Sequence, residues 1–260
     1  MIPKIIHYFW VGGNPKPKSV LQCIKSWKKY CPDYKIMEWN ESNYDFNKNA
    51  YMKQAFENKR WGFVTDCARF DVIYEYGGIY LDTDVELIKN LDSLLTHNSF
   101  FGYEEADDYY INCGSGFGSC AKNPIIKDLR DYYDNVYFVN DDATLNLIPL
   151  PIHNMHIFKK IGVNYDNSLQ NIDENVFYPS DYFCPKNFET GLLKITDNTY
   201  SIHHYDASWY NDKQQEEKKE RWKAYKSEYN KDYIMHLPNR ILKKLLGEDN
   251  YDKLKKKTKK

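Results

Sequence analysis

Asp82 and Asp84 are the residues whose types and spacing point most directly to chemistry. They follow a short apolar run in the segment YGGIYLDTDVE. Residues i and i+2 of a strand share a face, so both carboxylates are expected to project from the carboxyl end of a buried strand, where open α/β sheets bind ligands. Neighbouring carboxylates repel each other unless a cation lies between them, and Mg²⁺ or Mn²⁺ prefers oxygen ligands that it shares with phosphate. The pair therefore predicts a metal-bridged phosphate, such as a diphosphate.

An Asp-x-Asp sequence is weak evidence by itself, because a solvated turn is its ordinary explanation. Here it is the only such pair in the chain, and it follows a helix-like segment, Gly77-Gly78 and an apolar tripeptide. This context favours a functional metal site over a chance occurrence.

The preceding segment, FVTDCARFDVIYEY (residues 63–76), predicts a helix that begins near Thr65 or Asp66 and ends at Gly77. Asp66 and Arg69 are three residues apart and share one face of this helix. A surface ion pair is the simpler interpretation. However, the segment is apolar enough to be largely buried, and a buried Arg-Asp pair can hold a phosphate, a ribose or a sugar hydroxyl.

The elements around this segment predict an α/β fold. Residues 4–11 form an apolar run typical of a buried strand, apolar residues at helical spacing follow Ser19, and residues 34–39 predict a second strand. A β-α-β start indicates a parallel sheet with helices on both faces. Residues 141–200 show only weak patterns. Further strands are expected at 79–81, 100–103 and 115–119, and further helices at 124–133 and 214–229.

Composition limits the function classes. The 260 residues carry a net charge of −1, which argues against a nucleic-acid-binding protein. The N-terminus is too short and polar for a signal peptide, and no apolar run of about 18 residues occurs. Six cysteines without Cys-x-x-Cys spacing predict reduced thiols in a cytoplasmic protein. The 24 tyrosines and 6 tryptophans suit sugars and bases, although a genome of low GC content would also enrich tyrosine.

Residues 237–260 change character. Five apolar residues form a stripe beside basic ones, and the chain ends in KLKKKTKK. A basic amphipathic helix of this kind can lie on an anionic membrane surface, which would place a cytoplasmic enzyme at the inner face of the membrane. The alternative is a helix packed on the domain with a solubilising tail. The apolar stripe consists of Leu237, Ile241, Leu242, Leu245 and Leu246.

Three blocks together resemble glycosyltransferase family 32: KIIHYFWVGG near the start, FVTDCARFDVIYEYGGIYLDTDV in the middle and IHHYDASW late in the chain. The resemblance implies a GT-A type nucleotide-sugar-binding fold with a mostly parallel central sheet, in a single catalytic domain over residues 1–236. It also implies a nucleotide-sugar donor, Mn²⁺ or Mg²⁺ as cofactor, and transfer with retention of anomeric configuration.

The resemblance assigns donor-binding roles to several residues. Trp10 matches the aromatic residue that stacks on the nucleotide base, with Val11 beside it. Tyr80 matches a tyrosine near the ribose and diphosphate, and Trp209 matches a tryptophan that reaches the diphosphate and the donor sugar. Asn112 is expected near the anomeric face of that sugar.

The same resemblance implies that Asp66 and Arg69 bind the hydroxyl groups of the donor sugar. It implies that Asp82 contacts the ribose or the metal, and that Asp84 ligates the metal directly. His204 matches the C-terminal metal ligand. From the residues alone, both histidines of IHHYDASW are compatible with a metal, and a neutral imidazole favours Mn²⁺ over Mg²⁺.

One departure concerns the metal site. Some relatives carry a small hydroxylated residue two positions before the final tryptophan, where this chain has Ala207. Asp206, Ser208 or a water molecule would have to take its place.

The expected reaction is the transfer of a hexose from a nucleotide sugar to a hydroxyl group. We expect catalysis by Asp66, Arg69, Asp82 and Asp84, a UDP-sugar as donor with GDP-mannose as the alternative, and an acceptor that is a lipid-linked capsular or exopolysaccharide unit. Because the sequence offers no convincing carboxylate nucleophile, front-side attack is expected. A metal-dependent phosphohydrolase or nucleotidyltransferase would also use paired aspartates, whereas a sugar-binding module would need no site for a cation and a diphosphate.

Overall fold

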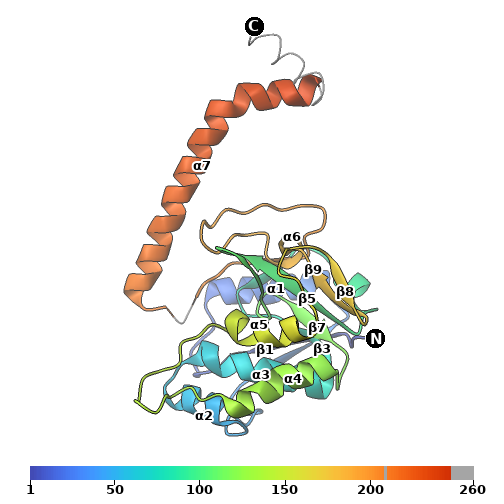
Figure 1. Cartoon of the computed structure of the whole chain (residues 1–260), viewed down its shortest axis with the longest axis vertical. Coiled ribbons are helices and arrows are strands. Elements are labelled where there is room, and N and C mark those ends of the chain that lie inside the picture. The colour runs from blue at the N-terminus through green and yellow to red at the C-terminus, as the bar shows by residue number, and fades with distance from the viewer. Residues whose placement is uncertain (208–209, 247–260) are drawn as a thin grey trace. The chain divides into compact units, whose positions relative to one another are not determined.

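A central eight-stranded sheet organises the chain (Figure 1). The computed structural model describes the backbone of residues 1–207 and 210–246, and the side chains of those residues up to 231. In spatial order the strands of this sheet are β2 (Lys35–Trp39), β1 (Ile5–Phe9), β3 (Gly78–Tyr80), β7 (Phe117–Ser119), β5 (Ser99–Glu105), β9 (Asn175–Tyr178) and β8 (Gln170–Ile172), with β6 (Tyr109–Ile111) paired to β5.

Most strands of this sheet run in one direction. β1 pairs in parallel with β2 and β3, and β5 pairs in parallel with β9. β7 lies antiparallel between β3 and β5, so the strands on its two sides share a direction. β6 and β8 are antiparallel to their neighbours. The predicted α/β class with a mostly parallel central sheet is confirmed.

Helices cover both faces of the sheet, and each face has its own apolar core. One core contains residues of α2, α3, α4 and α5, and the other contains residues of α1 and α6. The bounds are α1 (Lys18–Tyr30), α2 (Ala50–Glu57), α3 (Trp61–Tyr76), α4 (Pro124–Tyr132), α5 (Leu150–Lys160) and α6 (Ser180–Phe183), with short 3₁₀ turns at Asp92–Leu94 and Tyr133–Asn135.

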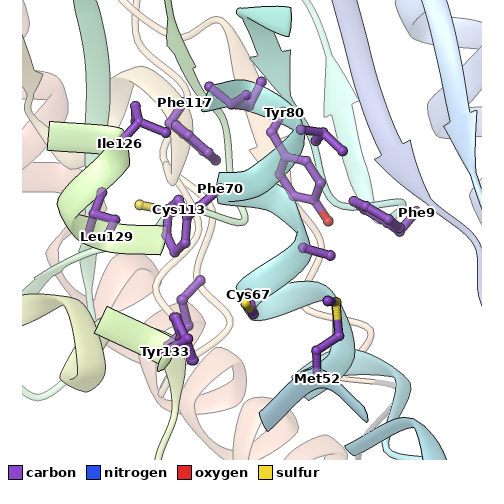
Figure 2. Close-up of a cluster of buried hydrophobic side chains, with 14 of the residues drawn as sticks. Phe9, Met52, Cys67, Phe70, Tyr80, Cys113, Phe117, Ile126, Leu129 and Tyr133 are labelled. Carbon is purple, nitrogen blue, oxygen red and sulfur yellow. The ribbon is translucent and has the colours of Figure 1, made fainter. Parts of the chain in front are cut away.

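Alternation along the buried strands explains the two cores. In β1, Tyr8 packs edge-on against Trp27 of α1, with ring centroids 5.4 Å apart. The next residue, Phe9, points to the opposite face, where it joins Phe70 of α3 and Tyr80 of β3 (Figure 2). Strands buried on both faces must be apolar at successive positions, which is why residues 4–11 read as a continuous apolar run.

Helix α3 begins earlier than the sequence predicted. Its first residue is Trp61, after the N-terminal flanking residue Arg60, so Thr65 and Asp66 lie inside the helix rather than at its N-terminus. The Thr65 hydroxyl donates to the Gly62 carbonyl at 2.8 Å, as small hydroxylated residues within helices often do. Gly77 ends the helix with a φ of 63°, as predicted.

The region 141–200, where sequence patterns were weak, contains regular structure. It forms α5, β8, β9 and α6, and α2 is a further helix that the sequence analysis missed. These elements are short, and α6 has only four residues. A helical period needs a window of about 11 residues to be distinguished, which α2 and α6 do not offer and α5 only just reaches.

A second, two-stranded sheet joins distant parts of the chain. β4 (Val85–Leu87) follows the aspartate pair directly, and β10 (Ser201–His203) lies antiparallel to it. The register places Val85 opposite His203. This pairing brings the late block of the sequence to the middle block.

The chain divides into two compact units, residues 1–188 with 193–211 and residues 189–192 with 212–260. Helix α7 (Asp212–Leu246) includes the helix expected at 214–229, and the predicted domain boundary at 236/237 falls inside it. Within the second unit, Arg221 lies 3.3 Å from Glu189. The side chains of the predicted apolar stripe and the lysine-rich tail lie outside the described part. Among the described residues, no helix is both long and apolar enough to cross a membrane.

Candidate active site

The aspartate pair lies in the turn between β3 and β4. β3 ends at Tyr80, one residue earlier than predicted, and Asp82 and Asp84 come just after its carboxyl end, as the sequence predicted. The Val85 amide donates to the Asp82 carbonyl at 3.1 Å and closes the turn, while the Asp82 amide donates to the Gly114 carbonyl at 2.9 Å. These bonds fix the backbone that carries both carboxylates.

His203 meets the aspartate pair from the other strand of the small sheet. Its Nε2 lies 3.2 Å from Asp84 Oδ1, and the backbone amide of Asp206 donates to Asp84 Oδ2 at 2.8 Å. Asp82, Asp84 and His203 each offer a ligand atom, and these atoms all lie within 4.8 Å of one another. Two carboxylates and an imidazole form a donor set that suits Mn²⁺, so the residues fit the divalent ion that the sequence predicts.

Electrostatics in the cluster reflect the close contact of Asp84 and His203. Burial opposes the ionisation of Asp84, but the charge and hydrogen bond of His203 outweigh it and lower the pKa of Asp84 to about 2. Burial also opposes protonation of His203, yet the neighbouring Asp84 raises the pKa of His203 well above its ordinary value. Asp84 and His203 therefore each favour the charged form of the other.

The structure places His203, rather than the predicted His204, beside the aspartate pair. His204, expected from the resemblance to join the metal site, instead places Nε2 3.0 Å from Glu86 Oε2. Successive side chains along an extended chain point to opposite sides, so only one of the two adjacent histidines can face Asp84. The His204 backbone amide still contributes, because it donates to the Asp84 carbonyl at 3.0 Å.

Asp66 and Arg69 form the buried pair that the sequence predicted. The Arg69 guanidinium, 3% exposed, lies 2.8 Å from Asp66 Oδ1 and 3.3 Å from Asp82 Oδ1. Arg69 therefore joins α3 to the aspartate turn. Burial raises the pKa of Asp66 to about 7, with Arg69 opposing this effect, and the carboxylates beside Arg69 raise the pKa of the guanidinium.

Tyr80 belongs to the same group of contacts. Its hydroxyl donates to Asp82 Oδ1 at 2.9 Å, and the Arg69 guanidinium lies 4.7 Å from the centre of its ring. The ring is fully buried, so only the hydroxyl reaches the site. Tyr80 and Arg69 together fix the orientation of the Asp82 carboxylate.

A glycine that the sequence analysis did not single out lies against Asp82. A Cβ on Gly114 would stand 2.1 Å from Asp82 Oδ2 and 3.0 Å from the Arg69 guanidinium. The side-chain oxygen of Asn112 accepts from the Gly114 amide at 2.7 Å, which places Asn112 near the aspartate turn, while its contact with the donor sugar stays a prediction. The glycine-rich stretch GSGFG after Asn112 is the sequence signal that could have identified this close approach.

The predicted base-stacking residue lies at the end of β1. Trp10 is partly exposed, its Nε1 donates to the Asn14 carbonyl at 2.6 Å, and Lys16 lies 5.8 Å from its ring. Val11 is buried in the core. Trp209 falls outside the described residues, so its contact with the diphosphate stays a prediction.

Comparison with known proteins identifies the class. Residues 17–101 match the family model described as a glycosyltransferase sugar-binding region containing the DXD motif. A relative from Acanthamoeba polyphaga mimivirus, named an uncharacterized glycosyltransferase, is 27% identical over 197 residues, which cover 72% of this chain and 77% of its own. The mannosyl phosphorylinositol ceramide synthase SUR1 of Saccharomyces cerevisiae is 28% identical over 151 residues, covering 54% of this chain and 37% of its own.

Inositol phosphoceramide mannosyltransferase 3 of Schizosaccharomyces pombe is 33% identical over 102 residues, covering 36% of this chain and 27% of its own. The chain thus spans less than half of these two yeast relatives. A solved glycosyltransferase involved in glycosylation of the major capsid of PBCV-1 aligns at a TM-score of 0.46 and 12% identity over 84% of this chain and all of its own. The chain carries a DXD glycosyltransferase region and is an enzyme of the glycosyltransferase class.

Proposed function

We propose that this enzyme transfers a hexose from a nucleoside diphosphate sugar to a hydroxyl group, with retention of configuration, on a GT-A type fold. One observation carries the proposal: Asp82, Asp84 and His203 bring ligand atoms within 4.8 Å of one another beside the buried Asp66–Arg69 pair. A site that combines a cation with an arginine suits a diphosphate joined to a sugar.

Asp82, Asp84 and His203 would hold Mn²⁺ or Mg²⁺. When bound, the ion would supply positive charge against the negative charge that develops on the leaving diphosphate. The backbone amides of His204 and Asp206 hold Asp84 in place from the β10 side. Asp84 is therefore oriented before any ligand arrives, which removes a reorganisation cost from the reaction.

Arg69 and Asp66 supply the polar groups that would position the donor. The Arg69 guanidinium donates hydrogen bonds to Asp66, Asp82, Thr65 and the Cys113 carbonyl, at 2.8 to 3.4 Å. Its side chain is consequently held by the protein, and Asp66 keeps a second carboxylate oxygen that can accept from a sugar hydroxyl. Fixed orientation of the sugar ring lowers the barrier to attack by the acceptor.

The donor is a UDP-sugar or GDP-mannose. Stacking on Trp10 and a histidine-containing Mn²⁺ site support UDP as the nucleotide. The yeast relatives are named for mannosyl transfer to inositol phosphoceramide, which supports GDP-mannose as the second candidate. Those names also support an acceptor hydroxyl carried on a lipid, in keeping with the lipid-linked capsular or exopolysaccharide unit and the inner membrane face expected from the sequence.

The test has two parts. The chain is first incubated with UDP-glucose, UDP-galactose and GDP-mannose, with Mn²⁺ or with a chelator. Metal-dependent release of one nucleotide is expected, and transfer of the sugar to an added acceptor distinguishes a transferase from a phosphohydrolase. Asp84→Asn is then compared with Asp108→Asn, which changes an exposed aspartate. Loss of metal-dependent turnover is expected only in Asp84→Asn, and unchanged turnover in that folded variant would contradict the proposal.

A further inference from the structure

A second buried carboxylate lies behind the metal-binding cluster. Glu104, near the end of β5, is only 8% exposed, whereas its neighbour Glu105 is exposed on the other face of the strand. A buried carboxylate is costly unless hydrogen bonds satisfy its oxygens. The position of Glu104 therefore calls for an explanation that Glu105 does not need.

The first contact of Glu104 leads to Asp82. The Asn112 side-chain amide donates to Glu104 Oε2 at 2.5 Å, and the oxygen of the same amide accepts from the Gly114 backbone amide at 2.7 Å. The Gly114 carbonyl in turn accepts from the Asp82 amide at 2.9 Å. An ionised carboxylate can only accept hydrogen bonds, so Glu104 makes the Asn112 side chain point its NH₂ group towards Glu104 and its oxygen towards the Gly114 amide. The hydrogen bonds from Glu104 to Asp82 depend on this orientation.

Glu104 also lies close to the histidine that meets Asp84. Glu104, Cys184 and His203 each offer one side-chain atom, and these atoms lie within 4.8 Å of one another. On its opposite side, the His203 ring presents Nε2 to Asp84. Glu104 accepts from Asn112 and His203 meets Asp84, so Glu104 and Cys184 lie directly behind the metal-binding histidine.

We infer that Glu104 is a positioning residue of the metal site, and that it holds the backbone of Asp82 in place through Asn112 and Gly114. Groups that hold metal ligands in place through hydrogen bonds contribute to metal affinity, and loss of such a partner typically weakens metal binding by about 10- to 100-fold. This inference rests on the proposed function, because it assigns Glu104 its role at the metal site proposed there.

Glu104→Gln tests the inference and Glu105→Gln is its matched control. The glutamine keeps the shape of Glu104 but removes the charge and can place an NH₂ group against that of Asn112. Binding of Mn²⁺ alone, and then with UDP or GDP, is measured by electron paramagnetic resonance of the free ion. We expect the Mn²⁺ dissociation constant to rise by at least about tenfold in Glu104→Gln and to stay within about twofold in Glu105→Gln.

A double variant separates positioning from general damage. In Glu104→Gln combined with Asn112→Asp, the introduced amide can donate to the introduced carboxylate, which can still accept from the Gly114 amide. Recovery of Mn²⁺ affinity relative to Glu104→Gln is expected. If Glu104→Gln does not fold, Asn112→Ser, which breaks the link to Asp82 but keeps Glu104, is compared with the unmodified chain in the same way.

The outcomes are distinguishable. If the unmodified chain does not bind Mn²⁺, with or without nucleotide, the proposed function and this inference both fail. If the unmodified chain binds Mn²⁺ and a folded Glu104→Gln variant, judged by melting temperature and circular dichroism, binds it equally well, only the role of Glu104 is overturned.

Discussion

His203 Nε2 lies 3.2 Å from Asp84 Oδ1, although one residue belongs to the late block of the sequence and the other to its middle block. The contact exists because β10 pairs with β4 immediately after the aspartate turn, with His203 opposite Val85. The small sheet therefore holds His203 beside Asp84, just as β3 holds the turn that carries the two aspartates. Which of two adjacent histidines arrives there is decided by strand alternation.

The two histidines should respond differently to substitution. His203→Ala removes a group in contact with Asp84, so we expect metal-dependent turnover to fall by about 100-fold or more, the cost of losing an oriented electrostatic group. His204→Ala loses only a partly exposed contact with Glu86 and should keep activity within about threefold, since exposed pairs contribute little. Nucleotide release at saturating Mn²⁺ is the measurement, and the reverse ranking would restore His204 as the ligand.

Arg69 should not tolerate lysine. An ammonium group keeps the charge but cannot reach Asp66, Asp82 and the Cys113 carbonyl together, so buried acceptors lose partners. We expect the free energy of unfolding to fall by about 1–3 kcal/mol and the KM for the donor to rise. Arg130→Lys, at a partly exposed position, is the control. Equal urea midpoints for the two variants would show that the Arg69 network contributes no stability.

Much of the fold could be predicted because its signals are local. The run at residues 4–11 and the apolar helix before Gly77 are each long enough for burial to leave a readable pattern. Helix α3 still started earlier than predicted, because the obvious capping residues, Thr65 and Asp66, are used inside the helix. Sequence patterns favour caps wherever such residues occur, and only the folded structure shows that the helix begins at Trp61.

Site residues could be predicted where residue type and sequence spacing together indicate a function. They could not be predicted where their position depends on how strands or loops pair in the folded structure. Asp82, Asp84, Asp66 and Arg69 are recognisable by residue type and offset. The choice of His203 depends on the β4–β10 register, and the closeness of Gly114 to Asp82 depends on how two loops meet. Neither relationship produces a periodic pattern in the sequence, so the sequence alone could not predict that His203 faces Asp84 or that Gly114 lies against Asp82.

Gly114→Ala is a steric test of that closeness. The added methyl group would stand 2.1 Å from Asp82 Oδ2, a distance that real contacts do not allow, so the Asp82 carboxylate must move. We expect a loss of Mn²⁺ affinity and turnover of about 10- to 100-fold, because a displaced ligand is no longer preorganised. Mn²⁺ binding and melting temperature are measured together. Unchanged Mn²⁺ affinity would show that Asp82 does not need its observed position.

His7 should make folding stability depend on pH independently of the active site. The imidazole is fully buried; its Nδ1 accepts from Trp39 Nε1 at 3.0 Å, so its Nε2 carries the proton and lies 2.9 Å from the Gly77 carbonyl. Burial lowers the pKa of His7 from 6.5 to about 4. Between these two values the unfolded chain binds the extra proton and the folded chain does not, so stability contributed by the neutral ring is complete above pH 6.5 and is lost as the pH falls towards 4.

The full effect of His7 is about 3 kcal/mol, from a pKa difference of about two and a half units. Asp66 acts in the opposite sense, because burial raises its folded pKa and its contribution to stability is lost as the pH rises towards 7. His7→Gln isolates the first effect, since an amide can accept from Trp39 and donate to Gly77 without titrating. Urea unfolding from pH 7.5 to 4.5 should show the unmodified chain losing stability relative to His7→Gln as the pH falls. Parallel pH profiles for the two proteins would show that His7 is not held neutral by the fold.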